Sequence, residues 1–207
     1  MTERHPVVFI HGLRLQASSW HQWVKLFEAH GYAAVAPGWP GHVPTVRAAR
    51  KSPRTRPGFG ISEVMEHYAQ IAVSFPARPV LIGHGFGGLL ALSLAAQIHA
   101  AGVIAIDAVP VSPSPEWALI DPVRPDMLTP RPDAHATNSS VGPVLLVVSG
   151  KSHRRAADLY ASREPPTLVA VTDVVAIPDR GGPSLVIDSR WQAVAESCLS
   201  WMDAHEL

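Results

Sequence analysis

The fold of this chain is decided by residues 78–91, which read Arg-Pro-Val-Leu-Ile-Gly-His-Gly-Phe-Gly-Gly-Leu-Leu-Ala. The apolar run at 79–82 predicts a buried strand, and the helical periodicity of 86–100 predicts a helix directly after it. Glycines at positions 83, 85 and 87 permit a sharp turn and a close approach of strand and helix. The stretch therefore predicts a strand, a tight turn and a helix.

The same alternation continues on both sides of this stretch, because short runs rich in Val, Ile and Ala recur with helical patterns between them. It is typical of a mostly parallel sheet with helices on both faces. The six expected strands span residues 6–10, 33–36, 79–82, 102–106, 144–149 and 172–177. The expected helices span residues 18–30, 61–75, 86–100 and 190–204. Ser18 or Ser19 is expected to cap the first helix, and residues 1–207 are expected to form a single α/β domain.

The composition argues against several classes of protein. The 207 residues are 47% hydrophobic and 16% charged, with 17 basic and 17 acidic side chains. Such a balance is unlike that of a disordered or nucleic-acid-binding protein. A single cysteine, Cys198, excludes an internal disulfide, and the absence of a long apolar segment predicts neither a signal peptide nor a membrane span. We expect a cytoplasmic protein with no nucleic-acid or membrane partner.

Two proline-rich stretches interrupt the alternation, at residues 37–58 and 108–142. Both leave the carboxyl ends of expected strands, where ligands bind in open α/β sheets, so we expect them to wall or cover a pocket. Two solvated loops are the alternative. Residues 42–60 also carry five basic and no acidic side chains. They would steer a carboxylated substrate or an acidic carrier protein, with a solvated loop again as the alternative.

The glycine turn has a chemical meaning. In the form Gly-x-Ser-x-Gly, a strand, turn and helix make a nucleophile elbow, whose central side chain attacks the substrate. Here the flanking residues are Gly83 and Gly87, and the centre is Gly85. Because glycine has no side chain, no nucleophile is expected at this turn.

With these features the whole chain resembles the α/β-hydrolase family, in particular its compact bacterial members. Four stretches besides the elbow carry the resemblance: His11-Gly12, 36–41, 144–150 and 187–191. The resemblance implies an α/β-hydrolase core without the usual antiparallel N-terminal hairpin. It also implies a cap in the 108–142 segment, which we expect to be reduced to coil because the segment is short and rich in proline.

Three positions depart from the pattern of that family. Gly85 replaces the nucleophile, Ser152 stands where an aspartate is expected, and Gly-Gly-Pro-Ser at 181–184 stands where Gly-His would supply the base. Three substitutions in separate segments indicate divergence from acyl-transfer chemistry. We therefore expect no triad-dependent serine hydrolysis.

Several residues remain as candidates for chemistry. The backbone amides of Leu13 and Phe86 are expected to form an inherited oxyanion hole beside Gly85. Asp107 is the leading candidate for proton transfer because it ends the strand after the elbow helix; a capped turn is its structural alternative. The further catalytic candidates are His84 and His153, each of which has a purely structural alternative.

Three more side chains are expected near the substrate: His11, Arg14 and Trp39. His11 would tie down its loop, Arg14 would meet an anionic group, and Trp39 would form an apolar wall. The scattered histidines and carboxylates show no metal-ligand spacing, so neither a metal nor another cofactor is expected.

The leading interpretation is a non-hydrolytic small-molecule enzyme, such as a cyclase, lyase or isomerase acting on a polarised carbonyl compound. A catalytically inactive protein that binds a ligand or a protein partner is the main alternative, and a residual esterase is another. A minor alternative is a dinucleotide-binding protein, because Gly83-x-Gly85-x-x-Gly88 followed by Asp107 also fits that fingerprint.

Overall fold

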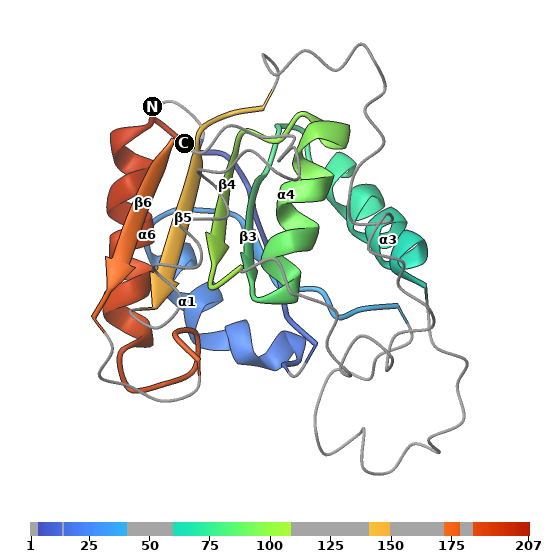
Figure 1. Cartoon of the computed structure of the whole chain (residues 1–207). Helices are drawn as coiled ribbons and strands as arrows, with labels where there is room; N and C mark the ends of the chain where they lie inside the picture. The colour runs from blue at the N-terminus through green and yellow to red at the C-terminus, as the bar shows by residue number, and fades with distance from the viewer. Residues whose placement is uncertain (1–3, 14, 41–59, 109–140, 150–171, 179–183) are drawn as a thin grey trace.

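The computed structural model describes residues 4–13, 15–40, 60–108, 141–149, 172–178 and 184–207 (Figure 1). Its strands form one six-stranded sheet in the order β2-β1-β3-β4-β5-β6, and every neighbouring pair is parallel. The strands are β1 (Val7–Ile10), β2 (Ala34–Val35), β3 (Val80–His84), β4 (Gly102–Ile106), β5 (Val144–Ser149) and β6 (Asp173–Ile177). The helices are η1 (Ala17–Trp20), α1 (His21–Ala29), α3 (Ile61–Val73), α4 (Phe86–Ile98) and α6 (Trp191–Ala204).

The structure confirms the predicted parallel sheet with helices on both faces. The predicted start of the first helix is wrong. The stretch expected to open the first helix is a 3₁₀ turn, η1, and α1 follows with Trp20 at its N-cap and no side-chain cap. The Ser19 hydroxyl instead donates a hydrogen bond to the carbonyl of Gln16, 2.5 Å away. The expected coil in place of a cap, at 108–142, lies almost wholly outside the described residues.

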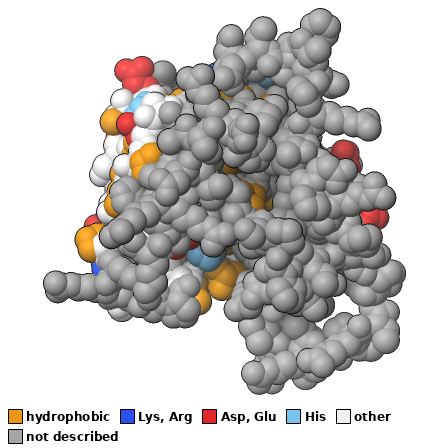
Figure 2. Space-filling model, in the orientation of Figure 1, with side chains coloured by type: hydrophobic (Ala, Val, Ile, Leu, Met, Phe, Trp, Pro, Cys, Tyr) orange, Lys and Arg blue, Asp and Glu red, His pale blue; other side chains and the backbone are white. Residues whose placement is uncertain are grey.

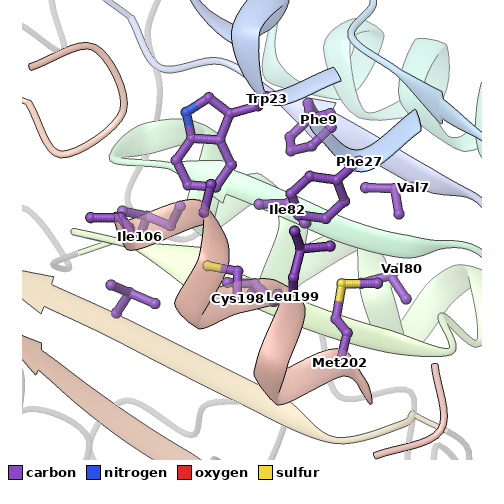
Figure 3. Close-up of a cluster of buried hydrophobic side chains, with 14 of the residues drawn as sticks. Val7, Phe9, Trp23, Phe27, Val80, Ile82, Ile106, Cys198, Leu199 and Met202 are labelled. Carbon is purple, nitrogen blue, oxygen red and sulfur yellow. The ribbon is translucent and has the colours of Figure 1, made fainter. Parts of the chain in front are cut away.

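One face of the sheet packs against α1 and α6. Alternate strand residues such as Phe9, Ile82 and Val147 lie in a single buried cluster with side chains from these two helices. Figure 3 shows Trp23 and Phe27 of α1, with Cys198, Leu199 and Met202 of α6, close to these strands. Since successive strand residues point to opposite faces, the intervening residues are left to a second layer.

The opposite face packs against α3 and α4 (Figure 1). Ile10, Leu81 and Val103 lie in a second buried cluster with Tyr68 of α3 and Leu94 of α4. Both faces of the central strands are therefore buried, which explains their nearly continuous apolar sequence. Within the described ranges, no helix has both the length and the apolar character that crossing a bilayer requires.

The strand register brings the predicted site to one edge of the sheet. Gly83 pairs with Ile10 of β1 on one side and with Ala105 of β4 on the other. The residues that follow these three central strands, including Gly12, Gly85 and Asp107, therefore meet at the carboxyl edge. This is the edge at which ligands bind in open parallel sheets.

Candidate functional site

The turn between β3 and α4 has the backbone of an elbow. Gly85 has φ +56° and ψ −119°, in the region that ordinary residues enter only with strain. Its N–H donates to the carbonyl of Ile106, 2.8 Å away, and its carbonyl accepts from the N–H of Gly88 at 3.1 Å. These two bonds fix the turn to β4 on one side and to the first turn of α4 on the other.

Glycines around the turn are required by close backbone contacts. A Cβ atom on Gly83 would lie 2.2 Å from the carbonyl oxygen of Gly87, and one on Gly87 would lie 2.2 Å from that of Ile10. Gly12 is also constrained, because a Cβ there would lie 2.8 Å from the carbonyl oxygen of His84. The loop after β1, the end of β3 and the start of α4 therefore touch through their backbones.

Gly85 differs from these glycines in its surroundings. Apart from its own chain neighbours, a Cβ atom built on it would meet no atom of the described residues within 4 Å. The elbow therefore leaves room for a nucleophilic side chain at position 85, and glycine leaves that room unfilled. An atom of a ligand would be able to approach the backbone closely at this point.

The predicted amide donors lie in adjoining segments. Phe86 is the first residue of α4, a helix of 13 residues, and the first amides of a helix point out of its N-terminus. A Cβ atom on Gly12 would lie 3.7 Å from the Phe86 nitrogen, so the loop that carries Leu13 is packed against this helix start. Leu13 also packs against the buried cluster that contains Phe86.

His84 lies between two segments of the carboxyl edge. Its Nε2 atom is 3.2 Å from the Oγ atom of Ser184, and its Nδ1 atom lies 3.7 Å from the point where a Cβ of Gly12 would stand. Nδ1 is buried and makes no hydrogen bond to any described residue. Burial lowers the pKa of His84 below its ordinary value of 6.5, and the negative charge of Asp107 opposes part of that shift. The ring is therefore neutral near pH 7.

Asp107 directly follows β4 and has a left-handed backbone with φ +47°. Its Oδ1 atom accepts a hydrogen bond from the backbone N–H of Ser149, 2.6 Å away. Its other oxygen makes no hydrogen bond within the part of the chain that the structure describes. Asp107 thus joins β4 to β5, a contact that neither its proposed catalytic role nor the capped turn predicted, and its carboxylate lies near enough to His84 to affect the pKa of that ring.

His11 and Trp39 form a buried wall beside the elbow. The Nδ1–H of His11 donates to the carbonyl of Gly12 at 3.0 Å, and its expected role in tying down the loop stays a prediction. The ring of Trp39 stacks on that of His11 at 5.4 Å and contacts Phe86 at 5.8 Å between centroids. Trp39 is buried, and its role as a substrate wall stays a prediction.

Ser184 is a residue of this site that the sequence did not single out. It is buried, and its Oγ accepts a hydrogen bond from the N–H of Val186 at 3.3 Å in addition to contacting His84. The carbonyl of Val186 accepts from Nε1 of Trp23 at 3.0 Å, so this segment is fixed to α1. Its contact with His84 joins residues 100 positions apart, which no local pattern indicates.

Several other predicted positions lie outside the described residues: Arg14, Ser152, His153, the basic stretch of 42–59 and residues 181–183. In the lower half of the space-filling view, a histidine side chain is visible beside hydrophobic ones (Figure 2). Across the described ranges, no three His, Cys, Asp or Glu side chains gather in a way that would hold a metal ion.

Comparison with known proteins agrees with this architecture. Residues 7–204 match the family model described as the alpha/beta hydrolase family. The comparison with curated proteins gave no match. Among solved structures, the chain is similar to that reported for LipS and LipT, two metagenome-derived lipolytic enzymes, at 16% identity and TM-score 0.66. That alignment covers 98% of this chain and 95% of the other.

Two further structures show the range of chemistry reported for this architecture. A monoacylglycerol lipase from Paleococcus ferrophilus is 19% identical, with TM-score 0.65 and coverage of 98% of this chain and 96% of that one. A variant of tomato methylketone synthase I, solved in complex with β-ketoheptanoate, is 15% identical, with TM-score 0.66 and 99% of each chain covered. At these identities the likeness concerns the fold alone.

Proposed function

Because the chain belongs to the α/β-hydrolase family, we propose that it is a small-molecule enzyme that binds a carbonyl compound at the elbow and acts without a nucleophile there. The observation that carries this proposal is Gly85. The elbow has its strained backbone and open space, and no side chain that attacks. A reaction that needs only stabilisation of charge on the carbonyl oxygen fits such a site.

In the proposed mechanism, the amides of Leu13 and Phe86 bind the carbonyl oxygen. Asp107, through the oxygen that is not bonded to Ser149, takes the proton from the carbon next to the carbonyl. The electron pair of that C–H bond moves toward oxygen and forms an enolate. His84 stabilises the enolate by holding or moving a proton at its oxygen, and return of a proton to carbon completes an isomerisation.

The electrostatics support these roles. A neutral imidazole is able to donate one hydrogen bond and accept another, which suits a group that handles a proton at an oxygen. His84 is neutral because it is buried. The nearby negative charge of Asp107 favours the protonated ring of His84. The protonation state of one group therefore affects the pKa of the other, as expected for a pair that handles protons in one reaction.

The substrate class is suggested by one structural neighbour. The methylketone synthase variant was solved with β-ketoheptanoate, a β-keto acid. Such compounds react through an enolate, either by loss of a proton or by loss of carbon dioxide. We extend this class to the present chain, and thus favour a lyase or isomerase over a hydrolase.

The test is deuterium exchange into the position next to a carbonyl, followed by ¹H NMR in D₂O. The probes are β-ketoheptanoate, its ethyl ester and 2-heptanone, and loss of carbon dioxide is read in the same spectra. We expect exchange or decarboxylation that saturates with probe concentration. Asp107→Asn and His84→Gln should each lower the rate at least about a hundredfold. His30→Gln serves as the control, because His30 lies exposed at the end of α1.

Each alternative gives a different result in these assays. Equal rates in wild type and His84→Gln would contradict the mechanism. Saturable binding without exchange of any probe would favour a ligand-binding protein. Stoichiometric labelling by a fluorophosphonate would favour an esterase, and a rise of the melting temperature with NAD or NADP would favour dinucleotide binding.

A further inference from the structure

The hydroxyl of Ser184 has a defined place in the hydrogen bonding of the site. Its oxygen accepts the N–H of Val186 at 3.3 Å. Its proton is then available for donation, and Nε2 of His84, 3.2 Å away, is the acceptor that the structure places within reach. Ser184 is buried, so water does not readily replace this partner.

We propose that Ser184 is a positioning residue that fixes His84 as the tautomer with its ring proton on Nδ1, so that His84 presents an N–H donor toward the loop of Gly12. In this arrangement the Ser184 O–H donates to an unprotonated Nε2. The neutral ring carries one proton, which must then be on Nδ1. The inference rests on the proposed function for its chemical meaning, although the tautomer itself does not depend on any ligand.

The opposite tautomer satisfies fewer polar groups. If Nε2–H donated to Ser184, the buried hydroxyl of Ser184 would have no acceptor among the described residues. The Nδ1 lone pair of His84 would also be unpaired. The proposed tautomer leaves only the Nδ1–H donor without a partner. Because an unpaired buried polar group is unfavourable, the arrangement with one such group is preferred over that with two.

The remaining unpaired donor has a functional consequence. A buried N–H is stabilised when an oxygen atom accepts from it. Nδ1 of His84 and the amide nitrogen of Phe86 each lie 3.7 Å from the point where a Cβ atom of Gly12 would stand, so both nitrogens lie close to the Gly12 loop. That point is itself closed to a ligand, because it is 2.8 Å from the carbonyl oxygen of His84. In the proposed mechanism, neutral His84 donates a hydrogen bond to the carbonyl or enolate oxygen, and the proton on carbon is left to Asp107.

The burial of Ser184, rather than its hydrogen bonds, argues against its direct use as a nucleophile. A serine O–H that donates to a histidine nitrogen is also found in activated nucleophiles, so the contact with His84 alone does not decide the role. A serine that attacks a carbonyl must be reachable by substrate, whereas the Ser184 residue is only 6% exposed. Ser184 instead determines which nitrogen of His84 carries the proton.

The tautomer is measured without any ligand, by long-range ¹H–¹⁵N NMR of histidine-labelled protein at pH 8, where His84 is neutral. His84→Gln assigns the signals of His84. We expect a protonated Nδ1 and an unprotonated Nε2 in the wild-type protein. Ser184→Ala should give a mixture of both tautomers, and Ser184→Thr, which retains the hydroxyl, should restore the Nδ1–H form.

Two results would overturn this inference: a wild-type His84 with its proton on Nε2, or a Ser184→Ala protein with an unchanged tautomer. If Ser184→Ala does not fold, the wild-type spectrum alone decides. A confirmed Nδ1–H tautomer together with no exchange of any carbonyl probe would reject the proposed function and leave the role of Ser184 standing. Where exchange is found, Ser184→Ala should lower kcat about tenfold with little change in KM, and Ser184→Thr should recover it.

Discussion

A Cβ atom on Gly83 would stand 2.2 Å from the carbonyl oxygen of Gly87, so the end of β3 and the start of α4 touch through backbone atoms alone. Real Cβ atoms are essentially never found below 3.0 Å from another heavy atom. Neither partner is a flexible side chain that would rotate away. The two glycines are therefore a structural requirement of the elbow, whatever chemistry the elbow performs.

Alanine substitutions at these glycines should show how much stability depends on steric clash and how much on backbone strain. We expect Gly83→Ala and Gly87→Ala each to lower the free energy of unfolding by about 3 kcal/mol or more, because backbone segments must move apart. Because the added methyl group of Gly85→Ala meets no described residue other than its chain neighbours within 4 Å, this substitution should cost only the strain of its positive φ, about 1–2 kcal/mol. Urea denaturation at pH 8 measures all three. Equal losses at positions 83 and 85 would show that the close contact does not govern stability.

The stability of the protein should fall in mild acid, and His84 should account for part of the loss. Its pKa is lowered in the folded state by burial, so the unfolded chain binds a proton more readily. The contribution of His84 to the free energy of unfolding is therefore complete above the pKa of the unfolded chain, 6.5. It decreases as the pH falls below 6.5 toward the lower pKa of the folded state.

Urea denaturation between pH 8 and pH 5 checks this expectation. The pH dependence of the unfolding free energy should be smaller in His84→Gln than in wild type, by at most about 1.4 kcal/mol per pH unit. His30→Gln, at an exposed position, is measured alongside as the control for replacing a histidine by glutamine. Identical slopes in all three proteins would mean that His84 does not titrate differently on folding.

Asp107 should influence the ionisation of His84 in a definite direction. Because the negative charge of Asp107 raises the pKa of His84 against the effect of burial, Asp107→Asn should lower that pKa further. NMR titration of the His84 ring in both proteins measures the shift. Asn also tolerates the positive φ at this position, which keeps the comparison free of backbone strain. An unchanged or higher pKa would disprove the coupling.

The segment that carries Ser184 should depend on Trp23. Trp23→Phe removes the buried hydrogen bond from Nε1 to the carbonyl of Val186 and leaves that carbonyl unpaired, at a cost of about 1–3 kcal/mol plus lost packing. Trp201→Phe is the matched control, because its Nε1 bonds to Asp173, a carboxylate that is 44% exposed and able to bind water instead. A smaller loss of stability in Trp23→Phe than in Trp201→Phe would refute this view.

The sequence predicted the fold well because its signal is periodic and local. All six strands and four α-helices lie within a few residues of their expected ranges. The start of α1 was wrong because the two serines at 18 and 19 look like a cap. In the folded chain Trp20 sits at the N-cap, and its ring packs on Phe9 at 4.8 Å. Tertiary packing, which the local pattern does not contain, sets this boundary.

The candidate site was predicted only in part. Its backbone was foreseen from the glycine pattern, and Asp107 and His84 lie at the expected edge of the sheet. The contact of His84 with Ser184 was not predicted, because residues 181–184 stand out in the sequence only as the place of a missing base. Hydrogen bonds between loops far apart in sequence depend on how the whole sheet is ordered, and a single sequence carries no direct signal for them.

The empty space at Gly85 has an evolutionary consequence. Since the surrounding glycines and the bond to Ile106 hold the turn in place, a side chain at its centre costs only the strain of the positive φ. A single codon change at this position would alter reactivity while leaving the architecture almost untouched. Lineages that share such a turn are thus able to lose one chemistry and acquire another without passing through an unfolded ancestor.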